Sequence, residues 1–489
     1  MTNIMEKRLH IEEETARCLL CADAPCGQKA ACAVRALRFE NPWKAREIFD
    51  QMTDDELQQA ESACIHYDRP IRIAELKKVV SERQTPNSKL QTPNSQLAIT
   101  FCGLHCENPF FLASSAICTN YEMVARALKA GWAGVFYKTI CKQDICEVSP
   151  RFDAVTKDGM PFIGFRNMEQ LSENPHTVDF DILRRLKQHF PTKIIVASIM
   201  GQTEEEWIEL AKMAEDAGCD AVELNFSCPQ MKLAGMGSDV GQNAELVLFY
   251  TAYVKNTVKI PVIPKMTPNI TSMNPVTMSA FYAKADAVSA INTIKSITMS
   301  PLAEVSGKRT VSGYSGKAVK PIALRFINEI AQVLRYTNNN KMEISGIGGI
   351  ETWRDALEYM QLGCRNVQVC TAVMEYGYRI IEDLIDGMKH YLAERGLDSV
   401  EAVVGEELPS FVRPSDLDRS TMVFPLIDRE TCIGCGRCFI SCSDAGHQAI
   451  TFEADRNPHI NGSKCVGCHL CRLVCPTGAI GIAKRMKKQ

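Results

Sequence analysis

The stretch 223–229, ELNFSCP, decides the fold of this chain and points to its chemistry. It begins within a largely apolar run from residue 221 to residue 226, which is typical of a strand buried on both faces. The run ends in Ser-Cys-Pro, and glycines follow at positions 235, 237 and 241. A buried strand that delivers asparagine, serine and cysteine to a glycine-rich loop indicates a catalytic strand end.

Short apolar runs alternate with amphipathic helical patterns from residue 98 to about residue 395. Eight candidate strands lie at 110–114, 134–139, 194–200, 221–227, 262–266, 287–292, 343–348 and 366–371. Helical patterns separate them, for example at 204–217 and 323–336. This alternation predicts an α/β fold, a (β/α)8 TIM barrel. A doubly wound sheet is the alternative, but its Gly-x-Gly-x-x-Gly turn after the first strand is absent.

Catalytic residues of such a barrel lie at the carboxyl ends of its strands. The predicted ends carry Ser114, Lys138, Thr139, Asn225, Ser227, Cys228, Lys265, Asn292, Thr293, Gly348, Gly349 and Thr371. Any single polar residue is expected where a strand leaves the core. Two lysines and two asparagines in one set favour a shared site.

The composition is that of a globular protein with two or three domains: 489 residues, 46% of them hydrophobic. A formal net charge of -3 gives no electrostatic reason to bind nucleic acid. No apolar run is long enough to cross a membrane. The first ten residues lack the apolar core of an export signal, so we expect a cytoplasmic protein.

The chain divides into five predicted segments. Two tandem Thr-Pro-Asn-Ser turns mark a linker at 85–97, because they carry turn signals and no periodicity. The linker separates a helical, cysteine-containing extension at 1–84 from the barrel at 98–398. A connector at 399–420 leads to a small, cysteine-rich α+β domain at 421–489.

The last domain carries two cysteine runs of the form Cys-x2-Cys-x2-Cys-x3-Cys, the duplicated signature of bacterial ferredoxins. In that arrangement the fourth cysteine of each run serves the other cluster. We therefore expect one [4Fe–4S] cluster on Cys432, Cys435, Cys438 and Cys475, and a second on Cys465, Cys468, Cys471 and Cys442. Zinc is the alternative, but zinc modules rarely show this exchange of the fourth ligand.

Iron–sulfur clusters pass single electrons and need a two-electron partner, for which a flavin in the barrel is the natural adaptor. Eight short motifs along the barrel carry a resemblance to a known family. They are NPF at 108–110, YKT at 137–139, SPR at 149–151, ELNFSCP at 223–229, KMTPN at 265–269, AINT at 290–293, SGYSGKA at 312–318 and GIGGI at 346–350. Residues 98–480 resemble the FMN-and-ferredoxin half of dihydropyrimidine dehydrogenases, in particular the bacterial two-subunit, NAD-dependent form. The barrel is also similar to dihydroorotate dehydrogenases.

The resemblance implies an oxidoreductase that acts on CH–CH groups and reduces uracil or thymine to the 5,6-dihydropyrimidine. It implies FMN on Ser114, Lys138, Lys265, Gly316, Gly348, Gly349, Thr371 and Ala372. It implies pyrimidine binding by Asn167, Glu169, Asn225, Ser227, Asn292 and Thr293, and Cys228 as the general acid. Asparagine suits a pyrimidine edge because its amide both donates and accepts.

No dinucleotide fingerprint occurs in the chain, so we expect the electrons of NADH to arrive through a separate FAD-containing, iron–sulfur reductase subunit. Two alternatives stay open at this point. One is a dihydroorotate dehydrogenase. The other is an electron-transfer module whose barrel has lost its activity.

Four cysteines near the N-terminus, Cys18, Cys21, Cys26 and Cys32, are similar to the helical iron–sulfur segment that opens the glutamate synthase small subunit. One interpretation is a third cluster on Cys18, Cys21 and Cys26, with Cys32 or Cys64 as fourth ligand. The other is a helical module without iron that docks the partner. The spacing between Cys26 and Cys32 departs from the usual pattern, and the sequence leaves both open.

Overall fold

The computed structural model describes residues 11–66, 68–82, 94–155, 162–229, 231, 235–299, 304–305, 307–337 and 341–488. Most of the linker predicted at 85–97 falls outside these residues. Contacts divide the chain into two units. The larger consists of Leu19–Met52 and Thr85–Ser410, and the smaller of Met1–Cys18, Thr53–Gln84 and Phe411–Gln489.

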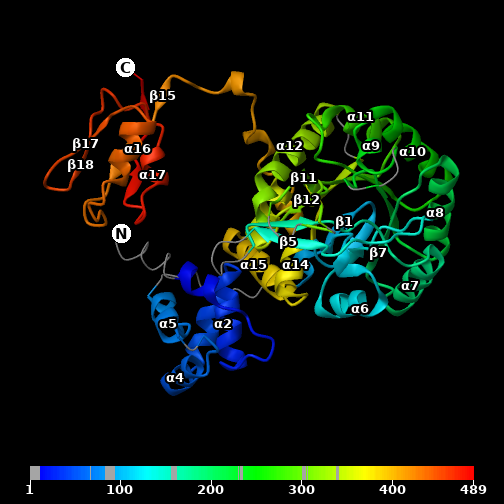
Figure 1. The fold of residues 1–489 in the computed structure, drawn as a ribbon, viewed down its shortest axis with the longest axis horizontal. Helices are drawn as coiled ribbons and strands as arrows, with labels where there is room; N and C mark the ends of the chain where they lie inside the picture. Colours follow the sequence, from blue (N-terminus) through cyan, green and yellow to red (C-terminus); the bar gives the residue numbers. More distant parts are fainter. Residues whose placement is uncertain are drawn as a thin grey trace. The chain divides into compact units, whose positions relative to one another are not determined.

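Eight parallel strands close into a barrel in the larger unit (Figure 1). In chain order they are β3 (Phe110–Leu112), β4 (Gly134–Phe136), β7 (Ile194–Ile199), β8 (Ala221–Asn225), β9 (Val262–Lys265), β10 (Ala287–Ala290), β13 (Glu343–Ile347) and β14 (Asn366–Val369). The last strand pairs with the first, with Val367 opposite Phe110. The predicted TIM barrel is confirmed, and each strand ends one to three residues before its apolar pattern does.

Helices follow the strands and surround them (Figure 1). They are α6 (Tyr121–Ala130), α7 (His176–His189), α8 (Glu204–Asp216), α9 (Ser238–Gly241), α10 (Ala244–Thr257), α11 (Asn274–Tyr282), α12 (Lys320–Tyr336), α13 (Trp353–Gln361), α14 (Thr371–Tyr376) and α15 (Ile380–Arg395). In α8, Thr203 caps the first turn while Trp207, Leu210 and Ala214 are buried at helical spacing. The helices predicted at 204–217 and 323–336 are both present.

A four-stranded antiparallel sheet, which we call the cap sheet, is built from two loops of the barrel. Its order is β11-β12-β6-β5, formed by Ile294–Ser296, Ser312–Ser315, Gly164–Asn167 and Phe152–Val155. The loop after β4 supplies β5 and β6, and the loop after β10 supplies β11 and β12. The sequence did not predict this sheet, because its strands are short and their pairing joins distant residues, such as Asn167 with Gly313.

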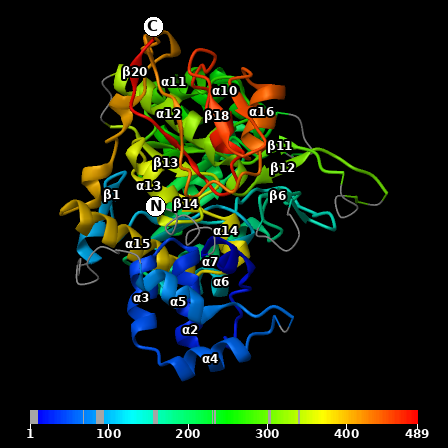
Figure 2. The same cartoon turned by 90° about the vertical axis from the view of Figure 1, so that its left-hand side faces the viewer.

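The segment Leu19–Met52 packs on the barrel helices as part of the larger unit, and Figure 2 shows its helices α2 (Gln28–Arg38) and α3 (Pro42–Asp50) near α15. The guanidinium of Arg35 lies 2.7 Å from a carboxylate oxygen of the fully buried Asp383. Trp43 stacks on His390 with ring centroids 3.7 Å apart. A hairpin of β1 (Ile99–Phe101) and β2 (Leu104–Cys106) precedes the first barrel strand.

The smaller unit contains two structured parts. The first part contains a helix at residues 11–17, α4 (Asp54–Ser62) and α5 (Ile73–Ser81). Its fully buried Glu14 forms ion pairs with Arg17 and Arg72, each at 3.0 Å. The C-terminal part has the α+β composition that was predicted. It contains α16 (Arg437–Ala445), α17 (Leu470–Leu473) and the strand pairs Thr421–Met422 with Met486–Lys487, Pro425–Ile427 with Ile480–Ile482, and Ile450–Phe452 with Pro458–Ile460.

Among the helices of the described residues, none combines the length and the apolar character needed to span a membrane. Short 3-10 turns occupy the predicted connector, at Val400–Val403, Leu408–Ser410 and Pro414–Asp416.

Candidate active site

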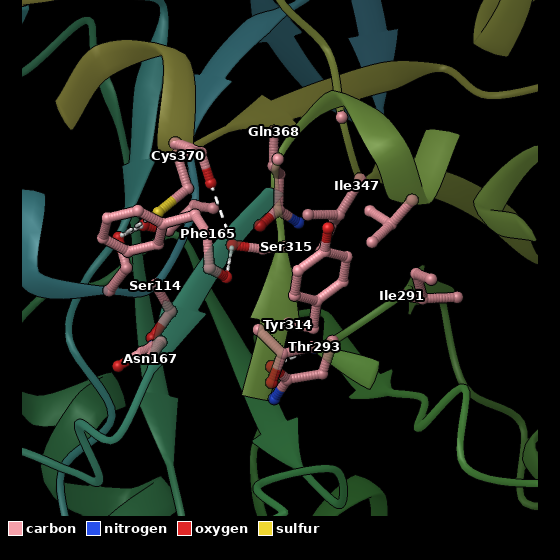
Figure 3. Close-up of a pocket in the computed structure, with 18 of the residues that line it drawn as sticks. Ser114, Phe165, Asn167, Ile291, Thr293, Tyr314, Ser315, Ile347, Gln368 and Cys370 are labelled. Carbon is pink, nitrogen blue, oxygen red and sulfur yellow. Dashed lines mark hydrogen bonds between the residues drawn. The ribbon is translucent and has the colours of Figure 1, made fainter. Parts of the chain in front are cut away.

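A cavity of about 1040 Å³, open solvent at its mouth included, lies at the carboxyl ends of the barrel strands. Figure 3 shows part of its wall, with Ser114, Asn167, Thr293 and Gln368 arranged around it. The wall contains all the residues predicted for acid, substrate and flavin except Ser227: Ser114, Lys138, Asn167, Glu169, Asn225, Cys228, Lys265, Asn292, Thr293, Gly316, Gly348, Gly349, Thr371 and Ala372. The fold thus brings together residues that span more than half of the chain.

Ser227 lies behind the wall and joins the two asparagines that form it. Its hydroxyl donates to Asn225 Oδ1 at 2.8 Å and accepts from Asn292 Nδ2 at 2.8 Å. Asn225 Nδ2 in turn donates to Thr139 Oγ1 at 2.9 Å. All four side chains come from strand ends, so the amides are held by a continuous hydrogen-bond chain. Ser227 therefore positions the asparagines, and its predicted contact with a substrate stays a prediction.

Two lysines bring positive charge into the cavity wall. Lys138 and Lys265 are 4% and 3% exposed. Lys138 Nζ lies 2.8 Å from Glu169 Oε2, and Lys265 Nζ lies 3.5 Å from Glu223 Oε1. The second oxygen of Glu169 bonds to Arg151 at 3.2 Å. Glu169 is therefore placed to orient Lys138, and its predicted contact with a substrate stays a prediction.

The late loops form a backbone cradle. Gly348 and Gly349 have φ values of +133° and +69°, and a Cβ there would come within 2.8 and 2.9 Å of neighbouring atoms. Gly316 also has a positive φ, of +88°. Beside them α14 begins at Thr371. Glycine loops and a helix start present backbone N–H groups, which suits a phosphate. Together with the two buried lysines, this donor set fits FMN.

Cys228 is 5% exposed and lines the cavity just beyond the end of β8. Its carbonyl accepts the N–H of Ser238 at 3.0 Å. A Cβ on Gly237 would lie 2.4 Å from that same carbonyl, and one on Gly241 would lie 2.0 Å from the carbonyl of Phe226. These two glycines are therefore needed for close backbone packing under the cysteine.

Two smaller cavities lie in the C-terminal part of the smaller unit, each lined by four cysteines. Cys432, Cys435, Cys438 and Cys475 line one of about 330 Å³. Cys442, Cys465, Cys468 and Cys471 line the other, of about 360 Å³. Each cavity takes its fourth cysteine from the other run. Four thiols around a hollow are the donor set of a [4Fe–4S] cluster, so these residues fit the group.

The N-terminal cysteines are divided between the units: Cys18 and Cys64 belong to the smaller, and Cys21, Cys26 and Cys32 to the larger. Within the described residues, no three His, Cys, Asp or Glu side chains are placed to hold a single metal ion. The third cluster therefore stays a prediction.

A closed barrel with this site, followed by two four-cysteine cavities, defines an iron–sulfur oxidoreductase of the TIM-barrel class. Residues 96–392 match the family model described as dihydroorotate dehydrogenase, and residues 425–482 match a 4Fe-4S dicluster domain. The chain belongs to the dihydropyrimidine dehydrogenase family.

Three relatives illustrate the similarity. The NAD-dependent dihydropyrimidine dehydrogenase subunit PreA of Escherichia coli K12 is 51% identical over 79% of this chain and 95% of its own length. The chloroplastic dihydropyrimidine dehydrogenase (NADP(+)) of Arabidopsis thaliana is 34% identical over 66% of this chain and 79% of its own length. The catalytic subunit of dihydroorotate dehydrogenase B (NAD(+)) of Thermococcus kodakarensis is 38% identical over 63% of this chain and 97% of its own length.

Several residues of the wall were not predicted. Phe165 and Tyr314 come from the cap sheet, which leaves no strong pattern in the sequence. Gln368 lies inside the predicted last strand, and its amide donates to Ser289 and Ser345 at 3.1 and 2.8 Å. A polar residue in an otherwise apolar strand was the available signal. Lys317 and Glu351, which follow the cradle glycines, were also missed.

Proposed function

We propose that this chain is the pyrimidine-reducing subunit of an NAD-dependent dihydropyrimidine dehydrogenase, which converts uracil or thymine to the 5,6-dihydro form. The observation that carries the proposal is a single cavity lined by Cys228, the asparagines, the two buried lysines and the glycine cradle. The similarity to enzymes of that name supports it.

The polar wall suits a pyrimidine ring. Uracil presents two carbonyl acceptors and two N–H donors, and Asn167, Asn225 and Asn292 each offer a donor and an acceptor. Thr293 adds a hydroxyl. Because Ser227 fixes two of the amides, their donors and acceptors are oriented before the ring arrives, which lowers the entropic cost of binding.

FMN, when bound, would supply a hydride equivalent to one carbon of the ring double bond. Cys228 gives a proton to the other carbon, since it lines the same cavity and a thiol releases its proton far more readily than a serine hydroxyl. Lys138 and Lys265 hold positive charge at the cavity wall, which stabilises negative charge that develops on a flavin ring. Gly316, Gly348, Gly349, Thr371 and Ala372 would hold the phosphate, and Ser114 would contact the ring system.

Electrons would enter through two [4Fe–4S] clusters, one on each four-cysteine cavity, from an FAD- and NADH-binding partner subunit. The name of the Escherichia coli relative, a subunit, supports the existence of a partner. We place the reaction in the cytoplasm, because no described cysteine forms a disulfide and reduced thiols suit that compartment.

The proposal is tested with protein purified without oxygen, examined for flavin, iron and turnover. We expect bound FMN, about eight iron atoms per chain, or about twelve if the N-terminal cysteines hold a third cluster, and oxidation of dihydrouracil with an artificial electron acceptor. NADH with uracil should give full turnover only after the partner subunit is added. Protein that binds no flavin, or that turns over NADH and uracil alone, would contradict the proposal.

A dihydroorotate dehydrogenase is the second candidate, favoured by the family model over residues 96–392 and by the Thermococcus kodakarensis relative. Dihydroorotate carries an additional carboxylate. Assays with dihydrouracil, dihydrothymine and dihydroorotate under identical conditions separate the two candidates.

A further inference from the structure

We propose that Lys317 and Glu351 are an exchange pair at the phosphate end of the flavin site: when the phosphate enters, Lys317 turns from Glu351 to the phosphate and Glu351 takes up a proton. The inference rests on the proposed function in one respect, that FMN occupies this cavity. It makes flavin binding a proton-coupled reaction.

The pair bridges the two loops that form the cradle. Lys317 follows Gly316, and Glu351 lies two residues after Gly349; all four residues line the cavity. Lys317 Nζ lies 3.8 Å from Glu351 Oε2. The lysine side chain is 42% exposed, so this is a loose contact of the kind that contributes little stability. A phosphate held by the cradle would offer Lys317 a stronger partner.

The other charges around Glu351 do not replace Lys317. Glu375 and Asp355 are carboxylates, and Glu375 Oε2 is buried without a hydrogen-bond partner among the described residues. Arg38, from α2, is the remaining cation, and its guanidinium lies over the ring of Tyr376 at 4.8 Å. Lys320 is held by Asp355 at 2.6 Å and Glu358 at 3.0 Å.

An ionised Glu351 beside a phosphate dianion is therefore unfavourable, and protonation removes the repulsion. Burial raises the pKa of Glu351 to about 7, so the proton is accessible near neutral pH. The balance is simple. One proton moves from solvent to a Glu351 carboxylate oxygen, no covalent bond of the flavin changes, and the resulting acid can donate a hydrogen bond to a phosphate oxygen.

The experiment is calorimetric titration of flavin-free protein with FMN at pH 8, in two buffers of different ionisation enthalpy. We expect an uptake of about one proton per FMN, and a Kd that rises about tenfold per pH unit above pH 7.5. Riboflavin, which lacks the phosphate, should bind with no uptake and no such pH dependence. Equal uptake with both flavins, or none with FMN, would overturn the inference.

Two variants test which side chain takes up the proton and which one binds the phosphate. Glu351→Gln should abolish the uptake and flatten the pH dependence of the Kd, because a neutral amide replaces the titrating acid. Lys317→Met should weaken FMN binding at least about tenfold and leave riboflavin binding unchanged. Glu358→Gln is the matched control, because it removes a carboxylate that pairs with the neighbouring Lys320. Its proton uptake and its Kd for FMN should equal those of the wild type.

Uptake that survives in Glu351→Gln would place the proton on the phosphate and overturn the inference. If Glu351→Gln does not fold, the comparison of FMN with riboflavin on the wild-type protein still decides. A protein that binds no FMN would remove the proposed function and this inference together. FMN binding without proton uptake would remove this inference alone.

Discussion

At the residue scale, the site depends on side chains that hold one another in place before any ligand arrives. Ser227 is the clearest case, because it is fully buried and bonds to both Asn225 and Asn292. Cys228, the next residue, instead lines the cavity. One strand end thus supplies adjacent residues with different surroundings, one that positions the amides and one that faces the cavity.

Replacing Cys228 with alanine should lower pyrimidine turnover at least about 100-fold, because the proposed proton donor is lost. FMN content, iron content and pyrimidine binding should stay near normal, since the thiol is not expected to hold any of these groups. The measurement is steady-state dihydrouracil oxidation together with flavin and iron analysis. Cys146→Ala, which removes an exposed thiol, is the control. Turnover near the wild-type rate in Cys228→Ala would exclude the acid role.

At the element scale, the segment Leu19–Met52 is fixed to α15 by a buried ion pair between Arg35 and Asp383. Burial raises the pKa of Asp383 to about 6, although Arg35 and Lys44 act to lower it. A carboxyl whose pKa is raised in the folded state stabilises the protein fully below its unfolded pKa. That contribution is lost as the pH rises through about 6.

Arg35→Met should therefore destabilise the larger unit in a pH-dependent way. At pH 8 it leaves a buried carboxylate without its cation, a loss of about 3–5 kcal/mol. At pH 5 Asp383 is mostly protonated and the loss should be much smaller. Urea denaturation at both pH values measures the difference, and Arg35→Met with Asp383→Asn should restore most of the stability at pH 8. An equal loss at both pH values would contradict this assignment.

At the scale of the whole molecule, electron flow depends on which thiols share a cluster. The two cavities predict that Cys442 serves the cluster of the second run, with Cys465. Adding Cys465→Ala to Cys442→Ala should then remove no further iron, and about four atoms per chain should remain. Cys442→Ala with Cys435→Ala should lose both clusters. Iron analysis and EPR spectra check this, and the reverse pattern would mean that each run binds its own cluster.

The sequence predicted the barrel well and its surroundings poorly, for a physical reason. Strands such as β3 are buried on both faces and therefore appear as continuous apolar runs, so local pattern is enough to find them. The cap sheet and the docking of α2 on α15 depend on partners far away in the chain, such as Asn167 with Gly313 and Arg35 with Asp383. The cysteine spacing was informative because it is itself the ligand pattern.

The cap sheet contributes residues that would contact the substrate ring, whereas part of the phosphate cradle lies outside it. Asn167 and Thr293 reach the cavity from the cap sheet or the loop beside it, whereas the cradle glycines Gly348 and Gly349 follow barrel strand β13. Substitutions at Asn167 and Thr293 can therefore alter which ring is recognised while Gly348 and Gly349 keep their place in the cradle. A library restricted to positions 167 and 293 would test whether ring recognition can change while the site of the phosphate is left intact.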